Sequence, residues 1–233
     1  MWENLKVYKQ LDKKDINSTF KKFGKAITAN LDNLYKIEQT TSLVKLSRQV
    51  NQLEQSIFIE KRTGGYDLKI QTCIKPIDFY KKHKFTMVNI VPLGDIMNNY
   101  RRTFYPLTQE WDQLAIYLSE RIKNEIELYF QKYSTYEKII DKKNEIEPKD
   151  FGLSNKFELL IYAAIRTKNK SLLLHYLDMK MSQPSMEVSY SEYLKPDSSE
   201  INEADFLQRL KTYVLTGDFV NIENEIAAVS KIN

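Results

Sequence analysis

Few side chains in this sequence have the chemistry of nucleophiles or metal ligands. The chain holds one cysteine, Cys73, and two histidines, His83 and His175. A nucleophilic thiol needs a neighbouring base, and nothing in the sequence fixes His83 near the sulfur of Cys73. Neither histidine has a second ligand at a metal-binding spacing, and no HExxH motif occurs. The sequence therefore predicts structural roles for these residues, with no catalytic residue, no metal and no cofactor.

Motifs that bind nucleotides or activate a serine are also missing from the sequence. The chain contains no GxxxxGK[ST], GxGxxG or GxSxG pattern, so nucleotide binding has no glycine-rich loop to rest on. Acidic residues are spread along helix faces, as solvated surfaces are. A hydrolytic enzyme would have to gather such scattered carboxylates in a cleft. This function is the least favoured of the three hypotheses considered below.

Basic residues interleaved with aromatic residues indicate nucleic-acid binding as one possible function. Single-strand binders stack bases on rings while Lys and Arg neutralise phosphates. Tyr80 and Phe85 flank one basic cluster, and Tyr100 and Phe104 flank another. The candidate nucleic-acid contacts in these clusters are Lys81, Lys82, Lys84, Arg101 and Arg102.

Two tyrosines in a polar stretch are the candidate protein contact. The segment EVSYSEYLKPD predicts a surface loop that exposes Tyr190 and Tyr193. Tyrosine is enriched at interfaces because it buries a large area and keeps a polar tip.

The elements that must position these residues follow from the hydrophobic period. Apolar residues three and four apart predict a helix from Asp15, whose side chain can cap it, to Leu34. Alternation predicts a strand over 41–48, and a further strand is predicted within KFTMVNIVPL. A long helix that opens at Thr108 is predicted to cover a sheet face with one apolar stripe, made of Leu107, Trp111, Leu114, Leu118, Ile122, Ile126, Tyr129 and Tyr133. A shorter helix follows over 135–142.

The stretch QSIFIEKRTGGYDLKIQTCIKP predicts a β-hairpin with its turn at Gly64-Gly65. In that register Lys61 faces Leu68, Ile59 faces Ile70 and Ile57 faces Thr72. The apolar side chains then share one face, and opposite charges such as Glu60 and Lys69 pair on the other. Cys73 lies on the face opposite Ile57 and Ile59.

The last third of the chain keeps a helical period. The segments beginning at Phe157 and Phe206 resemble each other at an offset of 49 residues. Each predicts a helix, a tight turn at Thr167-Lys168-Asn169 or Thr216-Gly217-Asp218, and a second helix. We expect two stacked αα-hairpins.

Charge is divided unevenly along the chain. Residues 1–106 hold 19 Lys and Arg against 10 Asp and Glu, a net charge of +9, and residues 107–233 hold 16 against 21, a net charge of −5. The asymmetry favours two functional units. The single cysteine, the absence of an apolar leader in MWENLKVYKQ and the lack of a membrane-length apolar run predict a cytoplasmic protein with no membrane contact.

One family shares this order of elements. Residues 15–142 resemble the bacterial domain of unknown function 4304 (DUF4304). The resemblance rests on a basic helix, the pattern EQSIFIEKRTGGYDLKIQTCIKP and the helix EWDQLAIYLSERIKNEIELYF that follows. The resemblance implies an α+β fold and a bacterial origin. It implies no reaction and no site residues.

Taken together, these patterns predict an α+β protein with two domains. Residues 1–142 form a DUF4304-like unit with an N-terminal helix, a four-stranded antiparallel meander and a long covering helix. Residues 150–233 form an all-α unit of about two αα-hairpins. We expect a non-enzymatic protein-interaction module, immunity-like or scaffolding, with the acidic helical unit as its docking face. The alternative is the nucleic-acid binder, and the oligomeric state is left open.

Overall fold

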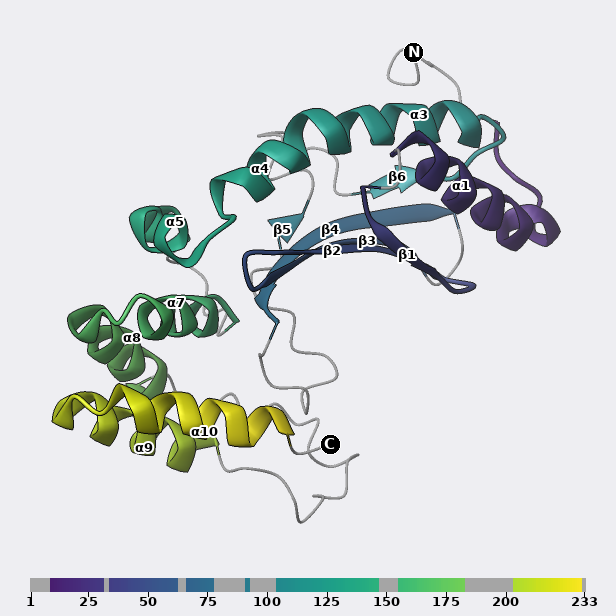
Figure 1. The fold of residues 1–233 in the computed structure, drawn as a ribbon. Helices are drawn as coiled ribbons and strands as arrows, with labels where there is room; N and C mark the ends of the chain where they lie inside the picture. The colour runs from purple at the N-terminus through teal and green to yellow at the C-terminus, as the bar shows by residue number, and fades with distance from the viewer. Residues whose placement is uncertain are drawn as a thin grey trace, which may run out of the picture. The chain divides into compact units, whose positions relative to one another are not determined.

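The computed structural model describes residues 9–31, 34–62, 66–77, 91–92, 104–146, 155–182 and 203–231. It combines helices with one antiparallel sheet (Figure 1), as the sequence predicts for an α+β protein. The chain divides into two compact units, with a division after Thr135. The short helix α5 (Tyr136–Asp141), which the sequence prediction counts with residues 1–142, belongs to the second of these units.

The sheet of the first unit is built from neighbouring antiparallel strands. Its strand order is β1-β2-β3-β4, and both β5 and β6 pair with β4. The strands are β1 (Lys36–Gln39), β2 (Leu43–Val50), β3 (Leu53–Lys61), β4 (Asp67–Pro76), β5 (Val91–Pro92) and β6 (Phe104–Pro106). The strand predicted over 41–48 is β2, and only the end of the one predicted in KFTMVNIVPL is described, as β5. The short strands β1 and β6 carry no strong alternation and were not predicted.

The central hairpin of β3 and β4 has the predicted register. Lys61 pairs with Leu68, Ile59 with Ile70 and Ile57 with Thr72. The predicted turn at Gly64-Gly65 lies outside the described residues. The preceding hairpin, β2 to β3, turns at Asn51 and Gln52, whose φ values of 48° and 67° are those of a type I′ turn.

Helices cover one face of this sheet (Figure 1). They are the short 3-10 turn η2 (Lys13–Asp15), α1 (Ile16–Asn30), α3 (Trp111–Arg121), the π-helical segment η3 (Ile122–Ile126) and α4 (Glu127–Lys132). Apolar side chains of both layers are buried between them, among them Phe23 and Ile27 of α1 and Ile57 and Ile59 of β3. The predicted cap by Asp15 is wrong, because its side chain makes no cap hydrogen bond and η2 leads directly into the helix.

The π-helical segment changes which residues the long helix buries. Apolar side chains recur every four residues at Leu114, Leu118, Ile122 and Ile126, and all are fully buried. In a regular α-helix each step of four residues drifts by about 40° around the axis. The wider turn of η3 absorbs part of that drift. The stripe therefore continues at Phe130, which is fully buried, while the predicted Tyr129 is partly exposed.

The second unit contains the two predicted αα-hairpins. After α5 and α6 (Lys143–Ile146), α7 (Asn155–Arg166) pairs with α8 (Lys170–Ser182), and α9 (Glu203–Thr216) pairs with α10 (Phe219–Lys231). Helix α8 also packs against α9, so the hairpins are stacked.

The turns of the two hairpins are equivalent at the predicted offset of 49 residues. Lys168 and Gly217 both have positive φ, 53° and 76°. In each turn the following residue, Asn169 or Asp218, bonds the preceding helix through its backbone N–H and the next helix through its side chain. Asn169 N donates to Ala164 O at 2.8 Å, and Asp218 N donates to Tyr213 O at 2.8 Å. The side chains of Asn169 and Asp218 then cap α8 and α10 by accepting the backbone N–H three residues on, at 3.2 and 3.0 Å.

Candidate functional site

The seven residues predicted to make contacts lie outside the part of the chain that the structure describes. They are Lys81, Lys82, Lys84, Arg101, Arg102, Tyr190 and Tyr193. Their roles stay predictions, and His83 lies outside as well.

Cys73 lies in the first compact unit and His175 in the second. Cys73 is buried and lies on the sheet face opposite Ile57 and Ile59, as predicted, with Ser56 as its cross-strand partner. His175 is exposed on α8, and its ring centroid lies 5.3 Å from that of Tyr176. Within the described ranges, no three His, Cys, Asp or Glu side chains gather in a way that could hold a metal ion.

A charged cluster links the helical layer to the sheet. Arg48 of β2 forms an ion pair with Glu127 of α4, with 2.8 Å between Nη2 and Oε2. Arg48 Nε donates to Gln55 Oε1 at 2.9 Å, and Gln55 Nε2 donates to the carbonyl of Phe130 at 3.0 Å. The guanidinium of Arg48 also lies 5.0 Å from the ring centroid of Tyr35. The cluster therefore fastens the end of the long helix to two neighbouring strands.

Tyr35 completes this cluster as a neutral donor. Its hydroxyl donates to Glu127 Oε1. Burial raises the pKa of Tyr35, and the hydrogen bond to Glu127 and the charge of that carboxylate raise it further, while Arg48 opposes them. The phenol therefore stays protonated, and each oxygen of Glu127 accepts from a donor, Tyr35 on one and Arg48 on the other.

A second charged cluster lies on the other face of the sheet. Glu54 of β3 accepts from Ser56 Oγ at 2.9 Å and pairs with Lys45 at 3.1 Å and Lys75 at 3.4 Å. Burial alone would raise the pKa of Glu54, but the Ser56 hydrogen bond and the charges of Lys75 and Lys45 together hold it below its ordinary value. A carboxylate held in its charged form is a poor general acid. The cluster neutralises charge across three strands.

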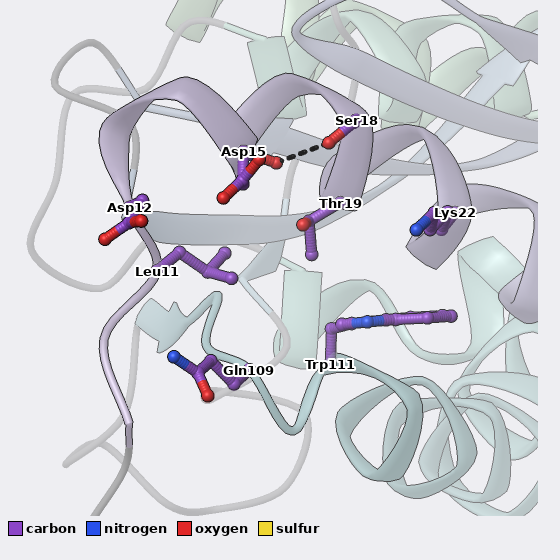
Figure 2. A pocket seen from close by; sticks show the side chains of 8 residues that line it. All are labelled: Leu11, Asp12, Asp15, Ser18, Thr19, Lys22, Gln109 and Trp111. Carbon is purple, nitrogen blue, oxygen red and sulfur yellow. Dashed lines mark hydrogen bonds between the residues drawn. The ribbon is translucent and has the colours of Figure 1, made fainter.

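A polar groove lies between α1 and the start of α3 (Figure 2). Its volume is about 260 Å³, below the roughly 300–1,000 Å³ of pockets that hold small ligands. Its lining residues are Leu11, Asp12, Asp15, Ser18, Thr19, Lys22, Gln109 and Trp111. The acidic side chains lie toward one end and Lys22 toward the other. The side chain of Trp111 extends along the side opposite α1 and is partly exposed.

Short backbone contacts bring the two sides of this groove together. Gln10 forms an isolated antiparallel bridge with Thr108. Gln109 N donates to Lys9 O at 3.0 Å, and Gln109 Nε2 donates to Gln10 O at 3.2 Å. Helix α1 also packs against α3. Hydrogen bonds between two segments about a hundred residues apart therefore hold Trp111 at the groove.

Sequence reasoning missed the groove and both charged clusters. The helical spacing counts Trp111 in the apolar stripe of the long helix. The signal that could have marked it is that Trp is rarely buried completely and that polar residues precede it in LTQEW. Arg48, Glu54 and Glu127 form their ion pairs with side chains of other strands or helices, and no local sequence pattern predicts these pairs.

Comparison with known proteins identifies no relative. No protein-family model matches the chain, and neither a curated protein sequence nor a solved structure matches it. In the part of the chain that the structure describes, no helix has the length and apolar character needed to cross a membrane.

Proposed function

We propose that this chain is a non-enzymatic protein-interaction module whose partner binds at the groove between α1 and α3. The observation that carries the proposal is Trp111, partly exposed along a groove rimmed by polar side chains. Tryptophan is enriched among the few residues that supply most of the binding energy at protein interfaces. A central aromatic residue with a polar rim is also the usual layout of such interfaces.

The rim offers hydrogen bonds and charge. Ser18 and Thr19 carry hydroxyls, Gln109 an amide and Lys22 an ammonium group. Outside the groove, the exposed lysines Lys21 and Lys25 continue the positive charge along α1. Lys22 and these lysines favour an acidic contact at their end of the groove, and Asp12 and Asp15 favour a basic contact at the other end. Opposite charges speed association and exclude wrong partners.

The charged clusters support a binding role over a catalytic one. Glu127 and Glu54 accept from two and three donors respectively, and their partners include arginine and lysine side chains. Such groups stabilise the fold. The groove, in contrast, presents polar groups at the surface.

We propose an immunity-like or scaffolding role, in which binding alone neutralises or organises another protein. Kinship of the first unit with DUF4304, a bacterial origin and a cytoplasmic location belong to the same proposal. The alternative, nucleic-acid binding through Lys81, Lys82, Lys84, Arg101 and Arg102, also stays a prediction.

Affinity capture with matched variants tests the proposal. The native chain, Trp111→Ala and Leu128→Ala are immobilised, and a lysate of the source organism is passed over each at low and at moderate salt. Leu128 is 63% exposed on α4 and does not line the groove, so it is the control. We expect one protein to be retained at both salt concentrations by the native chain and by the control, and to be lost from Trp111→Ala.

Two results would count against this function. Retention of the same protein by Trp111→Ala would exclude the groove as the contact. Retention of nucleic acid alone, and only at low salt, would favour the alternative, because binding through phosphates weakens steeply with salt.

A further inference from the structure

The sheet of the first unit has an exposed edge strand. β1 pairs with β2 on one side, and among the described residues no strand lies on its other side. The side chains of Lys36 and Glu38 are 78% and 54% exposed. The unpaired N–H and C=O groups of such an edge can pair with a strand from another chain.

The free backbone groups of this edge centre on Ile37. Thr40 N donates to Leu43 O at 2.8 Å, so the N–H of Thr40 faces β2. Neighbouring residues of a strand point their backbone groups in opposite directions. The groups of Glu38 and Lys36 therefore also face β2, and those of Ile37 and Gln39 face away from it.

We propose that β1 pairs with β1 of a second copy of this chain, antiparallel and with the two-fold axis at Ile37. Ile37 then exchanges two backbone hydrogen bonds with Ile37 of the second copy. Lys36 lies opposite Glu38 of the second copy, and Glu38 lies opposite its Lys36. Opposite charges directly across antiparallel strands are stabilising.

Other registers of the same two strands are disfavoured. A shift by one residue would place outward-facing backbone groups opposite groups that face β2, so hydrogen bonds could not form. A shift by two residues would place either Lys36 opposite Lys36 or Glu38 opposite Glu38, and like charges directly opposite are destabilising. The strand is therefore complementary to itself in one register, which favours a second copy over an unrelated peptide.

The strand is also held in place before any pairing. Lys36 and Glu38 already form an ion pair with each other at 3.3 Å on the face away from the helices. Gln39 Nε2 donates to the carbonyl of Phe20 in α1 at 3.4 Å. On pairing, the Lys36–Glu38 ion pair within each copy would be replaced by two such pairs between the copies, so the total number of ion pairs stays the same. Because the strand has four residues, the contact is small and the dimer should be weak.

Sedimentation equilibrium of the full chain over a range of concentrations tests the dimer. Lys36→Glu places Glu opposite Glu, and Glu38→Lys places Lys opposite Lys, so each should raise the dimer dissociation constant about tenfold or more. The double variant Lys36→Glu/Glu38→Lys restores both opposite pairs and should recover the native constant to within about threefold. Ile37→Pro removes an N–H that faces away from β2 and should abolish the dimer.

Three results would overturn the proposal. They are a native chain that stays monomeric up to about 1 mM, a dimer that the single charge variants or Ile37→Pro leave unchanged, and a double variant as weak as the single ones. Circular dichroism confirms that each variant is folded. If Ile37→Pro unfolds the chain, the three charge variants at Lys36 and Glu38 still test the dimer, because they change only exposed side chains. The dimer does not depend on the Trp111 groove, so failure of one proposal leaves the other standing.

Discussion

Arg48 and Glu127, 79 residues apart in the sequence, form the ion pair that fastens the long helix to the sheet. Their side chains are 22% and 14% exposed. Removing one partner from such a pair leaves a charge with little water to solvate it, which is more costly than removing both.

We predict that Glu127→Ala lowers the free energy of unfolding by about 3 kcal/mol. The double change Arg48→Met/Glu127→Leu should cost less than Glu127→Ala alone, because no charge is left unpaired. Urea denaturation measures both values. Equal losses in the two variants would mean that the charges are solvated by water and do not depend on each other.

The π-helical segment makes a prediction about Tyr129 and Phe130. Phe130 is fully buried and Tyr129 is partly exposed, so Phe130→Ala should cost about 4 kcal/mol of stability and Tyr129→Ala about 1 kcal/mol. A regular α-helix would favour burial of Tyr129, as the helical spacing in the sequence predicts. The reverse order of the two losses, measured by urea denaturation, would be inconsistent with η3.

The equivalent turns of the two hairpins allow an exchange experiment. Lys168 and Gly217 have the same left-handed backbone conformation, which costs a residue with a side chain about 1 kcal/mol. Lys168→Gly should therefore raise the thermal stability of the second unit, and Gly217→Lys should lower it. The space around Gly217 is open, because apart from its two chain neighbours no residue has a heavy atom within 4 Å of the position that a Cβ would take there. A steric clash therefore does not confuse the result. A loss of stability in Lys168→Gly would show that the side chain of Lys168 matters more than its backbone.

Stability at low pH should depend on Glu54. Its pKa in the folded chain lies below the ordinary value of 4.5. A carboxyl with a depressed folded pKa stabilises the fold above its unfolded pKa, and that contribution is lost as the pH falls through the folded pKa. Glu54→Gln should therefore be less stable than the native chain at neutral pH, and the difference should shrink as the pH falls below about 4. A difference that stays constant from neutral to acid pH would mean that the charge of Glu54 contributes nothing.

Local patterns in the sequence predicted the parts of the fold that local physics determines. The β3-β4 register followed from side-chain alternation, because a one-residue slip would expose the face that carries Ile57 and Ile59. The αα-hairpins followed from helical spacing and from the turn residues around Lys168 and Gly217. The position of Phe130 did not follow, since a π-helical segment has no strong sequence signature and shifts the buried stripe by one residue.

The candidate site could not be predicted from such patterns. Trp111 and Thr19 line one groove because α1 packs on α3, which the spacing of neither helix reveals. The pairing of Arg48 with Glu127 likewise depends on where α4 crosses the sheet. Sequence motifs report local chemistry, and these groups meet through tertiary packing.

The affinity of the captured partner for Trp111→Ala, relative to the native chain, tests the central claim most directly. Truncating a binding residue of this kind costs about 2 kcal/mol, so we predict that the dissociation constant rises about 30-fold. For Leu128→Ala the constant should stay within about twofold of the native value, because that residue lies outside the groove. An unchanged constant in Trp111→Ala, with the variant fully folded, would contradict the proposed interaction site.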